Sequence, residues 1–170
     1  MAALPQLFEM SLTTATPGYT ALRERAARVN LSARGKIRMT GDDRLRLLHA
    51  MTTQQIQDLK PGQGAYAFFL NAQGRILADV NVLCFEDHVL LDTEPEQRTK
   101  VYEHLDRYII TEDVQLADRS TEWTQLFISG SESEGVLKST LGIPEFAPGA
   151  GVRIVPVGEG SVRRFSLGAV

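Results

Sequence analysis

The stretch from Gly64 to Val80, GAYAFFLNAQGRILADV, constrains the fold more than any other part of the 170-residue chain. Two apolar runs flank the short sequence NAQG, in which Asn favours an Asx turn and Gly tolerates the left-handed backbone conformation. This pattern predicts a β-hairpin. In its first strand both alternating sets of side chains are apolar, which is typical of a strand in the interior of a sheet.

The second strand of this hairpin carries an acid in an otherwise apolar run. Because side chains alternate between the two faces of a strand, Ala78 lies on one face with Val80, and Asp79 lies on the other with Asn81. A buried carboxylate needs hydrogen bonds or a charge partner. Asp79 therefore contacts a polar ligand or braces a site, or it lies on a half-solvated face, or it pairs with a basic group such as Arg75.

Helix and strand patterns are mixed along the rest of the chain. Helices are predicted over residues 19–30, 43–51, 96–110 and 131–142, with a further helical turn in 52–59. Strands are predicted over residues 36–39, 85–91, 113–118, 123–129, 152–157 and 161–167. Hairpin-joined strands mixed with helices favour an α+β fold, with antiparallel or mixed sheets and packed helices, over a doubly wound one.

Composition excludes several classes of function. The net charge is −3 and no basic block occurs, so nothing supports binding to nucleic acid through a charged face. The single cysteine, Cys84, excludes an internal disulfide and cannot hold a structural metal alone, and the three histidines lack metal-like spacing. The longest apolar run, AYAFFL, is far below the ~20 residues that span a bilayer. We expect a cytoplasmic protein without a metal ion or a membrane segment.

The hairpin resembles that of the glycine-cleavage T-protein (aminomethyltransferase) superfamily, and the likeness covers residues 20–142. It is most similar to the YgfZ-type folate-binding branch, whose hairpin has the form GYAxFLNxQGRxLxDV. The resemblance implies a T-protein-like fold, tetrahydrofolate as the ligand, and an accessory role in iron–sulfur protein maturation and tRNA modification, with iron–sulfur client proteins as partners. It divides the chain into an irregular lead-in (1–18), a folate-binding region (19–142) and the start of a further strand region, expected to be truncated (143–170).

The resemblance also implies four folate-binding residues: Tyr66, Asn71, Arg75 and Asp79. Tyr66 matches a tyrosine of the family's folate pocket, where its ring could pack against a pterin or aminobenzoyl ring; the alternative is a core tyrosine. Asn71 matches the hairpin motif, and turn chemistry is the simpler explanation for it. Arg75 meets an anionic group such as a folate glutamate tail, or braces Asp79, or is an ordinary surface arginine.

The transferases of the superfamily read LNxxGGIxDD in this hairpin, and their first acid, to which catalysis is assigned, aligns with Ala78. An alanine cannot orient or deprotonate the reacting nitrogen of tetrahydrofolate, and Asp79 points to the opposite face. The resemblance therefore implies folate binding with no catalytic residue. A folate-dependent aminomethyltransferase and an interaction domain that does not bind folate remain the alternatives. The K-G-C-x-x-G-Q-E stretch of YgfZ-type proteins does not occur in this chain.

Overall fold

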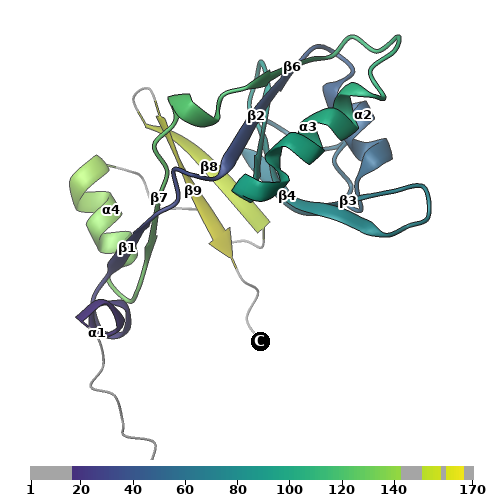
Figure 1. Ribbon diagram of the computed structural model, residues 1–170. Helices are drawn as coiled ribbons and strands as arrows, with labels where there is room; N and C mark the ends of the chain where they lie inside the picture. Colours follow the sequence, from purple (N-terminus) through teal and green to yellow (C-terminus); the bar gives the residue numbers. More distant parts are fainter. Residues whose placement is uncertain (1–16, 143–150, 158–159, 167–170) are drawn as a thin grey trace, which may run out of the picture.

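The computed structural model describes residues 17–142, 151–157 and 160–166, which form two antiparallel sheets and several short helices (Figure 1). The strands are β1 (Ala27–Asn30), β2 (Gly35–Thr40), β3 (Gln63–Leu70), β4 (Ile76–Cys84), β5 (Val89–Thr93), β6 (Gln115–Asp118), β7 (Leu126–Ser129), β8 (Gly151–Val157) and β9 (Gly160–Ser166). The helices are α1 (Pro17–Glu24), α2 (Arg44–Met51), α3 (Arg98–Asp106) and α4 (Ser133–Leu141), with 3-10 turns η1 (Pro95–Gln97) and η2 (Ser120–Glu122).

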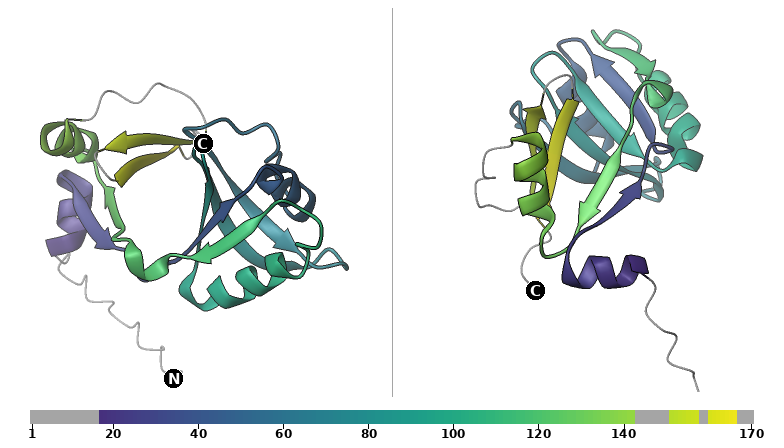
Figure 2. Two further views of the ribbon diagram at one scale, coloured as in Figure 1. Left: turned by 90° about the horizontal axis from the view of Figure 1, so that it is seen from above. Right: turned by 90° about the vertical axis from the view of Figure 1, so that its left-hand side faces the viewer.

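The large sheet has seven strands in the order β6-β2-β5-β4-β3-β8-β9, and the small sheet pairs β1 with β7. Helices α2 and α3 pack on one face of the large sheet, which we call the inner face; the opposite one is the outer face. Helices α1 and α4 lie beside the small sheet, away from α2 and α3 (Figures 1 and 2). The fold is therefore α+β with antiparallel sheets, as predicted.

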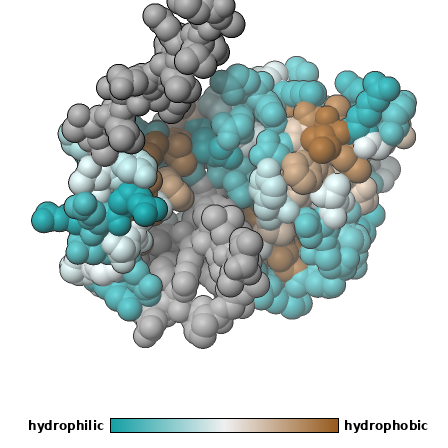
Figure 3. All heavy atoms as spheres, turned by 90° about the horizontal axis from the view of Figure 1, so that it is seen from below, coloured by the Kyte–Doolittle hydropathy of each residue, from teal (hydrophilic) through white to brown (hydrophobic). Residues whose placement is uncertain are grey.

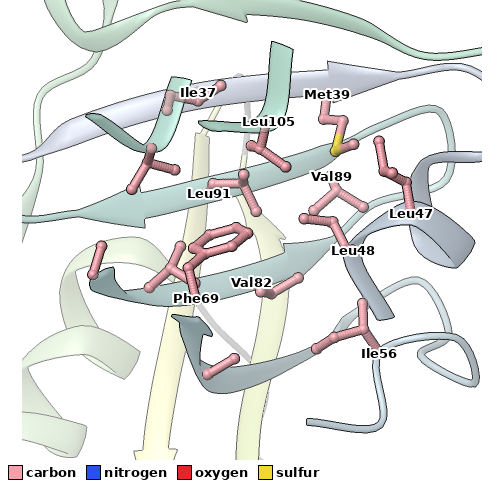
Figure 4. Packing of buried hydrophobic residues seen from close by; sticks show 14 of the residues in the cluster. Ile37, Met39, Leu47, Leu48, Ile56, Phe69, Val82, Val89, Leu91 and Leu105 are labelled. Atoms are coloured by element: carbon pink, nitrogen blue, oxygen red, sulfur yellow. The ribbon is translucent and has the colours of Figure 1, made fainter. Parts of the chain in front are cut away.

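The apolar core lies between the inner face and helices α2 and α3. Strands β2 to β5 contribute alternate side chains, and the helices contribute Leu47, Leu48, Val101 and Leu105. Phe69 is fully buried, and its ring lies close to Leu91 on the inner side of the sheet (Figure 4). Burial of this apolar surface is the main source of stability for the large sheet.

The predicted hairpin is confirmed as β3 and β4. The Asn71 side-chain oxygen accepts the backbone N–H groups of Gln73 at 3.0 Å and Arg75 at 2.9 Å, which closes the Asx turn. Gly74 has a φ of 74°, in the left-handed region that the turn requires. Strand β3 lies between β4 and β8, so the prediction of an interior strand is also confirmed.

Some predicted elements are wrong in type. The helix predicted over residues 19–30 ends at Glu24, because residues 27–30 pair with β7 instead. Residues 52–59 form no helix. There Thr53 leaves helical geometry to exchange hydrogen bonds with the Phe68 backbone.

Other predicted elements are correct in type but differ in their bounds. The strand predicted over residues 85–91 begins at Val89, since residues 85–88 form the turn between β4 and β5. The helix predicted over 96–110 is shorter, with α3 ending at Asp106. The strands predicted over 152–157 and 161–167 are present as β8 and β9. Most of the predicted lead-in lies outside the described residues.

None of the helices in the described ranges is both long enough and apolar enough to cross a bilayer.

Candidate functional site

A row of side chains crosses the outer face of the large sheet. The strand register places Tyr66 of β3 opposite Asn81 of β4. It then places Asn81 opposite Asp92 of β5, and Asp92 opposite Lys36 of β2. Exposure falls along this outer row, from 47% at Tyr66 to 1% at Asp92 and 2% at Lys36. The row is therefore accessible to a ligand at its β3–β4 end.

Tyr66 and Asp79 meet at the accessible end of the outer row. The Tyr66 hydroxyl donates a hydrogen bond to Asp79 Oδ2 at 3.0 Å. Phe68 lies beside both, with its ring centroid 5.3 Å from that of Tyr66 and its Cα directly opposite Asp79 across the strands. An aromatic surface, a hydroxyl and a carboxylate are thus brought together on a partly open face.

The pKa of Tyr66 is raised from its ordinary value of 10.0. Partial desolvation is the largest cause, followed by the hydrogen bond to Asp79 and the charge of that carboxylate. The charges of Arg34 and Glu94 also act on this hydroxyl, with opposite signs. The Tyr66 hydroxyl therefore remains protonated at neutral pH and is available as a donor.

The buried end of the outer row is held by an ion-pair cluster. The Asp92 carboxylate accepts hydrogen bonds from Arg34 Nε at 2.6 Å and from the side-chain amides of Asn81 and Gln125 at 3.4 Å. Arg34 also pairs with Glu94. Burial acts to lower the pKa of Arg34, but the hydrogen bond and charge of Asp92, with those of Glu94, outweigh it and raise the pKa. These partners satisfy one another, so the cluster is best explained as a brace of the sheet.

The four predicted folate-binding residues fall into two groups. Tyr66 and Asp79 come together, and the half-exposed Tyr66 is not a core tyrosine. Asn71 serves the turn. Arg75 is exposed near the hairpin tip, four residues before Asp79 and just ahead of β4. Within residues 17–142 it makes no ion pair, so it does not brace Asp79.

Ala78 does not lie at the accessible site, although it aligns with the acid to which catalysis is assigned in the transferases. Its side chain belongs to the core on the inner face and is 2% exposed. A carboxylate at this position would point into apolar surroundings, where ionisation is costly. Asp79, on the outer face, is the carboxylate that a ligand can reach. Ala78 therefore gives no ground for excluding a carboxylate from the accessible site.

Sequence reasoning missed Arg34 and Asp92. The predicted strand ends at Leu91, one residue short of Asp92, although continued alternation past Val89 and Leu91 places this acid on the outer face. Arg34 lies in the short connection between β1 and β2, where no periodic pattern identifies it.

No cluster of three or more His, Cys, Asp or Glu side chains suited to a metal ion occurs in the part of the chain that the structure describes.

Comparison with known proteins assigns the chain to a family. The GCVT N-terminal domain family matches residues 3–147. A chloroplastic protein of Arabidopsis thaliana with a provisional transferase name is 30% identical over 110 residues, which are 64% of this chain and 26% of that protein. An aminomethyltransferase of Rubrobacter xylanophilus is 28% identical over 120 residues, which are 71% of this chain and 32% of the enzyme. The chain thus spans about a third or less of these relatives.

A solved structure supports the fold. The aminomethyltransferase T of the glycine cleavage system from Bartonella henselae aligns with a TM-score of 0.65 and 21% sequence identity. The alignment covers 73% of this chain and 34% of the enzyme. The described sheets and helices therefore have the fold of the front part of a T-protein.

Proposed function

Because the chain belongs to the family of the GCVT N-terminal domain, we propose that it forms part of a protein that binds tetrahydrofolate on the outer face of its large sheet. The observation that carries this proposal is the Tyr66–Asp79 hydrogen bond beside Phe68. Aromatic rings offer a flat apolar surface to the pterin or aminobenzoyl ring of a folate. The Asp79 carboxylate can accept hydrogen bonds from pterin N–H groups.

Arg75 fits the same proposal as a contact for the glutamate tail. Arg75 is exposed and stands four residues before Asp79, just ahead of β4, so the usual strand rise limits their Cα separation to about 13 Å. A folate is an elongated molecule with its rings at one end and its carboxylates at the other. A folate with its ring against Tyr66 can therefore extend its tail towards the hairpin tip, where Arg75 supplies the opposite charge.

The role that we propose for this binding is that of a YgfZ-type accessory protein in iron–sulfur protein maturation and tRNA modification. Support comes from the hairpin GAYAFFLNAQGRILADV, in which Arg75 stands where the transferases have their second glycine. This role can be tested in a bacterium that lacks its own YgfZ-type protein. The present chain is expressed there alone, and also extended by the remaining part of a YgfZ-type protein. Recovery of iron–sulfur-dependent tRNA modification supports it; absence of recovery with a soluble extended protein contradicts it.

Folate-dependent aminomethyl transfer is a second candidate, favoured by the position of Asp79. This carboxylate lies on the accessible face, where it can approach the reacting nitrogen of a bound folate. Release of ammonia from an aminomethylated carrier protein, dependent on tetrahydrofolate and lost in Asp79→Asn, would establish transfer. Folate binding without ammonia release would contradict aminomethyl transfer and would favour the accessory role.

Calorimetric titration with tetrahydrofolate tests the binding itself. We expect saturable heat from the wild-type chain and about fivefold weaker affinity for Tyr66→Phe and Asp79→Asn, the effect of losing one hydrogen bond. The matched control is Asp106→Asn, which removes an exposed carboxylate at the end of α3, behind the inner face. If a folded wild-type protein gives no heat of binding and no thermal shift with tetrahydrofolate, this result contradicts folate binding and favours an interaction domain.

A further inference from the structure

Strand β4 extends past the end of its neighbour β5. It spans Ile76–Cys84 but pairs with β5 only over residues 81–84, because β5 ends at Thr93. The first half of β4, which carries Asp79, has no strand on that side among the described residues. Backbone N–H and C=O groups in a half-buried strand need partners, so something else must satisfy them.

Side chains take the place of the missing strand. Thr93 Oγ1 donates a hydrogen bond to the backbone oxygen of Asp79 at 2.8 Å, and Gln97 Oε1 accepts the backbone N–H of Asp79 at 3.2 Å. Lys100 continues the series, with Nζ donating to the backbone oxygen of Leu77 at 2.8 Å. The end of β5, η1 and α3 thus supply one side chain each along the edge of β4.

Strand β3, on the other side of Asp79, makes no hydrogen bond to the Asp79 backbone. Both backbone groups point towards Thr93 and Gln97, so the Phe68–Asp79 pair on the β3 side is of the non-hydrogen-bonded kind. Phe68 is likewise held from outside, by Thr53, which exchanges hydrogen bonds with its backbone at 3.1 Å each. The contacts of Thr93 and Gln97 are therefore the hydrogen bonds that hold the Asp79 peptide.

We propose that Thr93 and Gln97 are positioning residues that hold the Asp79 carboxylate in the geometry in which it accepts the Tyr66 hydrogen bond and contacts a ligand. Thr93 alternates with the outer-face Asp92 along β5, and the hydrogen bonds of both Thr93 and Gln97 go to the backbone from which the Asp79 side chain projects. A site of this kind depends on placement within about 0.5 Å, which a free strand edge does not provide. Only the ligand-contact part of this proposal rests on the proposed folate binding.

The test uses two isosteric pairs in the full chain. Thr93→Val keeps the volume of this fully buried side chain but removes the hydroxyl donor, whereas Thr93→Ser keeps the donor. Gln97→Leu removes the acceptor at a half-buried site, whereas Gln97→Glu keeps one. Because Gln97 is not fully buried, its pair remains informative if Thr93→Val fails to fold.

The first readout is the titration of the Tyr66 hydroxyl without ligand, followed by NMR of labelled tyrosines and assigned with Tyr66→Phe. The charged groups that act on it are Asp79, Arg34 and Glu94. We expect Thr93→Val and Gln97→Leu to move its pKa down towards 10.0 as the carboxylate shifts, and Thr93→Ser to keep it near the wild-type value. Gln97→Glu keeps the acceptor but adds a negative charge beside Asp79, so it should not lower the Tyr66 pKa. An unchanged Tyr66 pKa in both donor- and acceptor-deleting variants would overturn the positioning role, whatever their stability.

The second readout is tetrahydrofolate affinity in the presence and absence of Asp79. We expect Thr93→Val to weaken binding about fivefold in the wild-type background and to have no further effect in Asp79→Asn. Equal effects in both backgrounds would contradict action through Asp79. If the wild-type chain binds no tetrahydrofolate, the proposed function fails while the Tyr66 titration still decides the positioning role.

Discussion

The two sheets of this protein differ in how much apolar surface they bury. The buried hydrophobic side chains among the described residues all fall between Ile37 and Val114, in the large sheet, α2, α3 and their connections. Helices α1 and α4 contribute no buried residue. Large hydrophobic side chains are exposed in both regions, but only the large-sheet region also has a buried core. In the small sheet and its two helices the exposed ones are Tyr19, Leu22, Val29, Leu126, Phe127, Val136 and Leu141. In the view of Figure 3, apolar surface is visible on both the left and the right side of the molecule.

This difference locates the stability of the described fold. A two-stranded sheet is marginal by itself, whereas a multi-stranded sheet with a helix-covered face is a stable unit. Tyr66 and Asp79 lie on the large sheet, directly behind the core residues Ala67, Ala78 and Val80. The candidate site is thus built on the part of the molecule that is best able to hold side chains in fixed positions.

The largest effect should come from truncating the core. Phe69→Ala removes a fully buried ring and should lower the free energy of unfolding by about 3–5 kcal/mol. The control is Phe127→Ala in the small sheet, where the ring is 45% exposed and the cost should stay below about 1 kcal/mol. Urea denaturation measures both; equal costs would break the distinction between the sheets.

The next effect concerns the brace at the buried end of the outer row. Arg34→Met removes the guanidinium that pairs with the Asp92 carboxylate and should cost about 2 kcal/mol, since the two side-chain amides remain among the contacts of this carboxylate. Arg38→Met removes an exposed pair with Asp87 and should cost at most about 0.5 kcal/mol. The same urea titrations compare them. An Arg34→Met protein as stable as Arg38→Met would show that the cluster does not brace the sheet.

A smaller, local effect is expected in the small sheet's helices. Gly142 ends α4 with a φ of 62°, and Gly142→Ala should cost about 1 kcal/mol through backbone strain. Amide hydrogen exchange should become faster in α4 and stay unchanged in β2 to β5, because α4 contributes no residue to the core of the large sheet. Faster exchange throughout β2 to β5 would instead show that α4 and the large sheet unfold as one unit.

The smallest effect is a pH dependence within the large-sheet region. His104 packs edge-on against Phe69 and Tyr108, and desolvation, then the charges of Arg107 and Lys100, lower its pKa below 6.5. The unfolded chain therefore binds a proton first as the pH falls, so stability should decrease below about pH 6.5 and level off below the folded pKa. His104→Phe should remove this part of the pH dependence in thermal unfolding. An identical pH profile in the variant would contradict it.

The predictable parts of the structure are those with local signals. The period-2 alternation and the NAQG turn predict the hairpin, the interior position of β3 and the opposite faces of Ala78 and Asp79. Strand β1 was not predicted because four residues carry little alternation, and their partner β7 lies far along the chain. A strand of this kind is fixed by pairing and not by its own sequence.

The candidate site follows the same division. That Asp79 and Tyr66 share a face follows from the hairpin register once the turn is placed. The contacts of Thr93 and Gln97 with the Asp79 backbone depend on where β5 ends, which the sequence pattern does not mark. The burial of Ala78 in the core cannot be predicted from the hairpin alone, because it depends on the packing of α2 and α3 over the inner face.

The most direct test of the proposed site is NMR chemical-shift mapping of the full chain with tetrahydrofolate. The comparison of the two sheets makes the expected pattern specific. Binding at the outer row should shift the signals of Tyr66, Phe68 and Asp79 and leave Val29 and Phe127 in the small sheet unchanged. Shifts confined to the small sheet and its exposed apolar side chains, with Tyr66 and Asp79 unperturbed, would contradict the site.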